Sequence, residues 1–195
     1  MHKVQALIQE IKKLEDELLL EVEKQQDQFS YQLNDNGVLF DKETQTKHKA
    51  EAQNILKYIY EAPIKNILTL PIIWFGLIPA LFMDLFASIY QAICFKVYGI
   101  PKVNRSDYIV IDRQNLRYLN GIERLNCIYC GYFNGVTSYT QEIAARSEQY
   151  WCPIKHAKKT KSTHRHYHSF VEYGDYEDYQ DKLIKIRKQL ELLDK

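Results

Sequence analysis

ILTLPIIWFGLIPALFMDLFASIYQAICF, residues 67–95, is the longest apolar stretch of this chain. Asp84 is its one acidic residue, and it contains no lysine, arginine or histidine. On a membrane-insertion scale each Ile, Leu or Phe contributes about −0.3 to −0.6 kcal/mol, whereas a central Asp costs about +2.5 to +3.5 kcal/mol. The apolar side chains together outweigh Asp84, and about 20 such residues reach across a bilayer. The sequence therefore predicts a membrane-inserting segment over residues 66–98, with membrane lipid as its partner.

Gly76 and Pro79, in the middle of this stretch, predict a turn of the chain inside the bilayer. Basic residues flank the stretch on both sides, at Lys65 before it and at Lys96 and Lys102 after it. Because basic flanks are retained on the cytoplasmic side, both ends are expected on that side. This favours a helical hairpin in the inner (cytoplasmic) membrane. A single span and a buried helix of a soluble core are the alternatives.

Asp84 has two interpretations within such a segment. An ionisable side chain at bilayer depth indicates a functional site. Near the base of a hairpin or at an oligomer interface, however, a carboxylate simply reaches water or a hydrogen-bond donor, and we favour this second interpretation.

The composition excludes some classes of function. The formal net charge is +1, so no global field attracts nucleic acid, and no nucleic-acid partner is expected. The N-terminus mixes acidic and basic residues with apolar ones, so it lacks the apolar core of a secretory signal. The four cysteines do not resemble a secreted disulfide framework and are expected to stay reduced. No nucleophile–base set, phosphate loop or nucleotide fingerprint is present, which favours a non-enzymatic protein.

Both ends of the chain space their apolar residues like heptads. At the N-terminus these residues are Val4, Leu7, Ile11, Leu14 and Leu18. At the C-terminus they are Tyr179, Leu183, Ile186, Leu190 and Leu193, behind the candidate N-cap Asp175. We expect two terminal helices that pair like a coiled coil or that bind a protein partner or a second copy. The alternative is that each lies on the core of its own chain.

Shorter patterns predict the remaining elements. Residues 28–40 alternate in polarity and contain Asn36-Gly37, which predicts a β-hairpin. Residues 42–61 predict an amphipathic helix that ends before Pro63. Residues 108–112 predict a short strand, and Asp112 is the candidate cap of a helix that ends near Asn120.

The stretch NCIYCGYFNG places Cys127 and Cys130 three positions apart, with a glycine directly after the second. On a tight turn, two thiolates at this spacing bind one metal ion, and the glycine lets backbone N–H groups point toward sulfur. A matching pair, Cys152 and His156, follows VTSYTQEIAARSEQYW, which predicts a helix. The sequence therefore predicts a Cys3His metal site made of these four residues.

Zinc is the expected occupant, because structural zinc is common at Cys3His sites. Iron is the alternative, since the two metals are hardly separable from sequence at a thiolate site. A redox dithiol of Cys127 and Cys130, or a chance grouping of inert cysteines, are further alternatives.

Three alternating histidines follow, at His164, His166 and His168, and they suit a metal site of their own or a replacement for His156. We favour solvated histidines in a basic loop. The basic residues here are Lys155, Lys158, Lys159, Lys161 and Arg165, and such a run attracts anionic lipid headgroups. Glu142 and Glu148, on the intervening helix, are interpreted as surface or capping groups and not as metal ligands.

NCIYCGYFNG followed by EIAARSEQYWCPIKHA resembles a family of uncharacterised bacterial proteins. The resemblance covers residues 126–157, together with the apolar segment that precedes them. It implies a bacterial source, and it implies no particular activity.

The predicted fold class is mainly α with a small β component. Four segments follow one another: an N-terminal helix, hairpin and amphipathic helix (1–65), the membrane-inserting segment (66–98), the Cys3His module (99–174) and a C-terminal amphipathic helix (175–195). We expect a membrane-associated, non-enzymatic protein with a structural zinc site on the cytoplasmic side and a helical protein-interaction surface. The alternative is a membrane-tethered redox protein that uses iron–thiolate or the Cys127/Cys130 dithiol.

Overall fold

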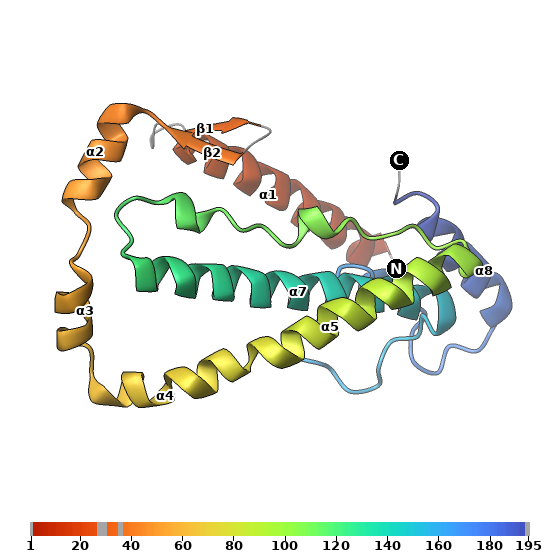
Figure 1. The fold of residues 1–195 in the computed structure, drawn as a ribbon. Helices are drawn as coiled ribbons and strands as arrows, with labels where there is room; N and C mark the ends of the chain where they lie inside the picture. The colour runs from red at the N-terminus through yellow and green to blue at the C-terminus, as the bar shows by residue number, and fades with distance from the viewer. Residues whose placement is uncertain (1, 27–30, 35–36, 194–195) are drawn as a thin grey trace. The chain divides into compact units, whose positions relative to one another are not determined.

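The computed structural model describes residues 2–26, 31–34 and 37–193. As predicted, the chain is mainly helical with a small β component, one two-stranded sheet (Figure 1). It divides into two compact units, and each is discontinuous in sequence. The first contains Met1–Tyr60 and Asp112–Arg124, and the second contains Glu61–Ile111 and Leu125–Lys195. The predicted segments follow one another along the chain, so they did not indicate that residues 112–124 belong to the N-terminal unit.

The N-terminal unit begins with α1 (His2–Gln26), the predicted first helix. The apolar residues of its heptad pattern are largely exposed, from 50% at Leu7 to 64% at Leu18. The side chain of Val4, the first residue of that pattern, lies outside the described residues. A partner for this apolar face of α1 therefore stays a prediction.

A β-hairpin follows α1, as predicted for this region. β1 (Tyr31–Asn34) pairs antiparallel with β2 (Gly37–Phe40), and Asn34 lies opposite Gly37. The first residues of the predicted range, 28–30, and the turn at Asp35 and Asn36 lie outside the described residues.

The helix predicted over residues 42–61 is two helices, α2 (Lys42–Ala50) and α3 (Ile55–Glu61). Asp41 caps the first, because its Oδ1 accepts a hydrogen bond from the backbone N of Thr44 at 2.7 Å. Asn54 begins the second in the same way, accepting from the backbone N of Leu56 at 2.8 Å. The single-helix prediction was wrong because Asn54 forms a new helix start inside the amphipathic pattern.

The structure describes residues 108–120, and they form neither the predicted strand nor the predicted helix. Residues 108–112 are irregular, and a short 3-10 turn, η4 (Arg113–Asn115), precedes a long helix, α7 (Gly121–Trp151). Asn120 starts α7, because its Oδ1 accepts hydrogen bonds from the backbone N of Ile122 and Glu123 at 3.0 and 3.1 Å. Glu123 in turn accepts from the backbone N of Asn120 at 2.9 Å, which completes a reciprocal capping box.

The turn expected at the first cysteine pair is replaced by helix, since both cysteines lie inside α7. The glycine after Cys130, expected to form that turn, lies inside the helix, and so does Gly135. A Cβ on Gly135 would lie 2.8 Å from the carbonyl O of Tyr108 and 2.9 Å from the Cα of Ile109. Glycine is therefore required at Gly135 because another segment of backbone crosses α7 there.

The apolar segment forms one continuous helix over Ile64–Tyr98, made of α4 (Ile64–Phe75), α5 (Leu77–Tyr90), a π-helical turn η2 (Gln91–Phe95) and α6 (Lys96–Tyr98). The hairpin predicted at Gly76 and Pro79 is wrong, because Gly76 has helical angles, φ −58° and ψ −19°. Pro79 lies in the first turn of α5, where a missing N–H is tolerated. We call this element the apolar helix.

The apolar helix runs beside α7 in the same direction (Figure 1), and together they form most of the second unit. The 3-10 turn η3 (Arg105–Asp107) lies in the segment that leads away from the apolar helix. The buried core of this unit consists of Ala87, Phe95, Ile100, Val103, Tyr139, Ile143 and Leu190.

The C-terminal helix α8 (Tyr179–Leu190) lies on this core, which is the alternative considered for it. Leu183 and Ile186 are buried, and the side-chain amide of Gln149 in α7 donates to the carbonyl O of Ile186 at 3.0 Å. The expected N-cap, Asp175, instead binds Lys182 at 2.7 Å, and the helix begins four residues later. Between α7 and α8, Ile154 pairs with Val171, and a 3-10 turn, η5 (Tyr167–Ser169), contains the last histidine of the run, His168.

Candidate functional site

The contact between the apolar helix and α7 is the most unusual feature of the chain. Small or polar residues of the apolar helix face α7, and Ala80, Ala87 and Gln91 are buried there. Most of its large apolar side chains are exposed instead, with Phe86 at 64%, and Phe95 in η2 is a fully buried exception. In α5 and η2 the exposed set consists of Ile78, Leu81, Phe82, Met83, Leu85, Phe86, Ile89 and Ile93.

Asp84, the one acidic residue of this stretch, lies on the side that faces the rest of the unit. Its carboxylate accepts hydrogen bonds from Arg105 Nε and Nη2, at 3.1 and 2.6 Å. The hydroxyl of Tyr132, in α7, donates to the same carboxylate at 2.9 Å. The Asp84 side chain is only 13% exposed. Asp84 therefore reaches donors of its own chain, in line with the structural interpretation favoured from the sequence.

A second polar contact lies further along the same face. The side-chain amide of Gln91 bridges to the backbone of Val103, accepting from its N at 2.9 Å and donating to its O at 3.3 Å. The same amide donates to the hydroxyl of Tyr139 in α7. The hydroxyls of Tyr90 and Ser147 are hydrogen-bonded at 2.6 Å. The apolar helix is thus held to α7 by hydrogen bonds as well as by the core contacts of Ala87 and Phe95.

The outer face of α7 has the opposite character. Beside α5 it exposes Asn134, Thr137, Ser138 and Gln141. The exposed side chains of α5 are therefore mainly apolar, whereas these four exposed side chains of α7 are polar.

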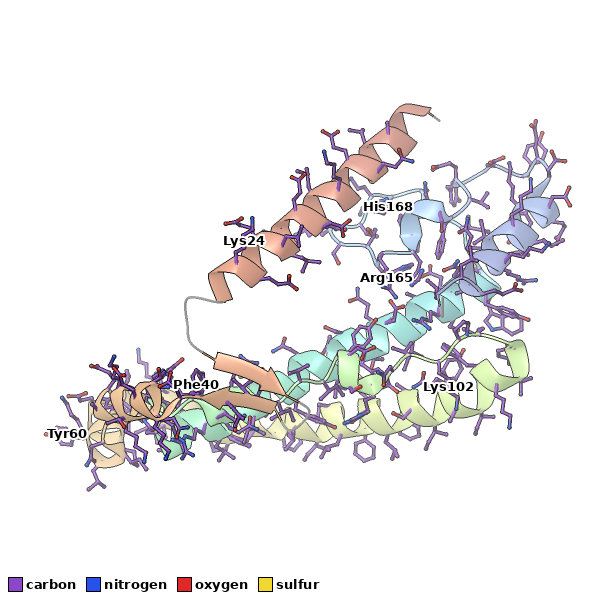
Figure 2. The ribbon with its side chains drawn as sticks, turned by 90° about the horizontal axis from the view of Figure 1, so that it is seen from above. Lys24, Phe40, Tyr60, Lys102, Arg165 and His168 are labelled. Atoms are coloured by element: carbon purple, nitrogen blue, oxygen red, sulfur yellow. The ribbon has the colours of Figure 1, made fainter. Side chains whose placement is uncertain are left out.

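A buried ionic cluster joins α7 to the segment that follows it. Glu142 is 6% exposed, and its Oε1 accepts hydrogen bonds from Arg146 Nε at 2.9 Å and from Arg165 Nη2 at 2.6 Å. His166 Nε2 lies 3.1 Å from the same oxygen. Figure 2 shows Arg165 on the segment beyond α7. The interpretation of Glu142 as a surface group was wrong, because Arg165 and His166 from a distant segment cover it.

The charge state of Glu142 follows from these contacts. Burial by itself raises the pKa of a carboxyl group, because it penalises the charged form. Here the hydrogen bonds from His166, Arg165 and Arg146 outweigh burial, and the pKa of Glu142 falls from 4.5 to about 2. Glu142 therefore stays ionised at neutral pH, and its hydrogen bonds tie the segment after α7 to the helix.

The other histidines of the run are also partly engaged. His164 Nε2 lies 2.9 Å from Glu148 Oε2 of α7, and the His164 side chain is only 14% exposed. His168 is exposed. The prediction of solvated histidines was therefore wrong for His164 and His166. A signal for half of the buried cluster is present in the sequence, because Glu142 and Arg146 are four positions apart on a predicted helix.

The predicted metal ligands are placed at two separate positions. Cys127 and Cys130 lie on one turn near the start of α7, whereas Cys152 and His156 follow its end. The helix between Cys130 and Trp151 is continuous, which separates the pairs by about 31 Å at 1.5 Å per residue. Among the described residues, no three His, Cys, Asp or Glu side chains are grouped to hold a metal ion.

All four cysteines are free thiols, and Cys130 and Cys152 are exposed. Zinc or iron at the four predicted ligands stays a prediction. It now requires an interruption of α7 or one pair from each of two chains. The Cys127/Cys130 dithiol likewise stays an alternative from the sequence.

Comparison with protein-family models, curated proteins and solved structures gives no match to this chain.

Proposed function

We propose that the protein is a monotopic membrane protein whose apolar helix lies in the plane of the bilayer surface. The observation that carries the proposal is the inverted arrangement of this helix, with hydrogen-bonding residues toward α7 and large apolar residues outward. In water, an exposed apolar patch of this extent is unfavourable and marks a surface that another phase covers. Lipid removes that penalty, while small and polar residues are the common contacts between helices in a membrane.

The helix length supports an in-plane orientation. Residues 67–95 extend for about 43 Å at 1.5 Å per residue, which exceeds a hydrocarbon core of about 30 Å. A spanning helix would also draw α7 into the hydrocarbon beside it. The exposed Asn134, Ser138 and Gln141 would then lose water without gaining partners. A helix lying at the interface avoids this cost, because α7 then faces water.

The basic flanks of the apolar helix support a position on the cytoplasmic face of the inner membrane. Lys96 and Lys102 are exposed at its C-terminal end, where they are suited to anionic headgroups. The exposed apolar face of α1 offers a helical surface for a protein partner or a second copy. The role we propose is therefore attachment of that interaction surface to the membrane, without catalysis.

Vesicle flotation tests this proposal directly. The full chain, purified in detergent and reconstituted with phosphatidylcholine and phosphatidylglycerol vesicles, should float with them and resist extraction by high salt. Leu81→Gln, Leu85→Gln and Ile89→Gln together should abolish flotation, since each apolar side chain removed from water contributes about 1.5–3 kcal/mol. Because all three side chains are exposed, thermal unfolding in detergent should be nearly unchanged.

The matched control changes three exposed apolar residues of α1, Leu7→Gln, Leu14→Gln and Leu18→Gln. This variant should still float. The proposal is contradicted if the unmodified protein is recovered in solution without detergent. It is equally contradicted if the α1 variant loses flotation while the α5 variant retains it.

A further inference from the structure

A groove of about 930 Å³ lies between α5 and α7. Pro79 and Tyr90 mark its two ends on α5, and the α7 wall extends from Thr140 to Trp151. Ala87 and Ala144 line it, and their small side chains leave space between the helices. Its volume is within the range of about 300–1,000 Å³ that is typical of small-molecule sites.

The shape and lining of the groove suit a flexible apolar chain. From Pro79 to Tyr90 it extends for about 16 Å along α5 at 1.5 Å per residue. Phe82, Met83 and Phe86 form the α5 wall. Phe82 and Phe86 also belong to the exposed apolar surface of α5, so the groove is continuous with the face that we assign to lipid.

A basic segment follows the groove in sequence and is linked to it through His164. Trp151 lines one end of the groove, and the chain leaves it into the basic segment and returns at His164, which binds the groove residue Glu148 at 2.9 Å. Lys161 is three positions before His164, so their Cα atoms are at most about 10 Å apart. Lys159 and Lys161 are exposed. Lys155 is already paired with Glu172 at 2.5 Å and is not counted here.

We propose that this groove holds one acyl chain of an anionic phospholipid, with the headgroup at the Trp151 end beside Lys159 and Lys161. The inference rests on the proposed membrane association, because the lipid enters from the bilayer. The apolar walls supply burial for the chain, and the lysines supply the attraction for the anionic headgroup.

Photo-crosslinking tests the occupant. The full chain is reconstituted in phosphatidylcholine vesicles that contain phosphatidylglycerol with a diazirine in one acyl chain, and adducts are located by mass spectrometry. Adducts are expected on both walls of the groove. Ala144→Phe fills the groove from an exposed position and should remove these adducts while flotation is retained. Ser138→Phe adds the same side chain to α7 outside the groove and should leave the adducts unchanged.

The headgroup contact is tested by competition between lipids. Lys159→Gln with Lys161→Gln should lower the preference for phosphatidylglycerol over phosphatidylcholine adducts about tenfold or more, since each lysine near an anionic surface contributes about 1 kcal/mol. Lys185→Gln with Lys188→Gln removes the same charge from exposed positions on α8 and should have no such effect.

The outcomes separate the two proposals. A chain that floats but gives equal adducts with and without Ala144→Phe overturns the groove proposal and leaves membrane association intact. Adducts found only on the outer face of α5 would likewise overturn the groove proposal and leave membrane association intact. A chain that does not float overturns both, because the proposed occupant is a membrane lipid.

Discussion

Glu142 is the residue whose environment departs furthest from what the sequence alone suggests. Its partner Arg146 is detectable as an i, i+4 pair, but Arg165 and His166 are brought to it by the path of a segment with no repeating pattern. Sequence reasoning therefore reaches half of the cluster. The other half depends on tertiary structure, as does the contact of Asp84 with Arg105.

The ionised state of Glu142 makes stability depend on pH. Because its pKa is about 2 in the folded chain and near 4.5 otherwise, the stabilisation is fully present above about pH 5. It is lost as the pH falls from about 4.5 to 2, and it amounts to about 3 kcal/mol. Acid titration of the unfolding free energy in detergent should show this loss.

Glu142→Gln should remove most of that pH dependence. At pH 7 it should also destabilise the chain by about 3–5 kcal/mol, because Arg146 stays buried without its counter-charge. The exposed Glu191→Gln is the control and should change stability by less than about 0.5 kcal/mol. Equal acid sensitivity in the Glu142→Gln variant and the unmodified chain would show that another group is responsible.

At the scale of elements, the sequence contains the start signal of α7, but the prediction interpreted that signal as the end of a helix. Asn120-Gly-Ile-Glu123 is a capping-box pattern, yet the asparagine and glycine were interpreted as the end of a helix. The glycine after Cys130 was interpreted as a turn residue, although it lies inside α7. Only the backbone of Tyr108 and Ile109 against Gly135 shows why a helix requires glycine there, and that contact is not local in sequence.

The continuous α7 predicts that the two pairs of predicted metal ligands behave independently. Cys152→Ser should leave the maleimide reactivity of Cys127 and Cys130 unchanged, because about 31 Å of helix separates the pairs. His156→Ala should likewise have no effect on them. Cys94→Ser is the control for nonspecific changes in thiol exposure.

The contrary outcome has a clear signature. If purified protein holds zinc or iron in proportion to chain, and Cys152→Ser releases the metal and exposes Cys127 together, the four residues share one centre. The helix would then have to be interrupted, or two chains would each contribute a pair, and the sequence prediction would be restored.

For the whole molecule, hydropathy predicts that residues 66–98 enter the membrane, and the basic flanks predict that both ends of this segment lie on one side. The orientation that we propose for it comes from the structure. The hairpin followed from treating Gly76 and Pro79 as a turn, whereas an in-plane helix also keeps both ends on one side. The proposal of an in-plane helix rests on the exposed polar residues of α7 and the exposed apolar residues of α5, which only the packing of the two helices reveals.

The most direct test of this arrangement is the accessibility of a nitroxide label at two positions in the vesicle-bound chain. With the native cysteines changed to serine, one label is placed at Leu85 of α5 and another at Ser138 of α7, both exposed positions. Collisions with oxygen, which partitions into lipid, and with a water-soluble nickel chelate are compared by electron paramagnetic resonance. We expect the Leu85 label to meet oxygen and be shielded from nickel, and the Ser138 label to meet nickel. Nickel access at both positions would contradict lipid contact by the apolar helix, and shielding at both would contradict its in-plane orientation.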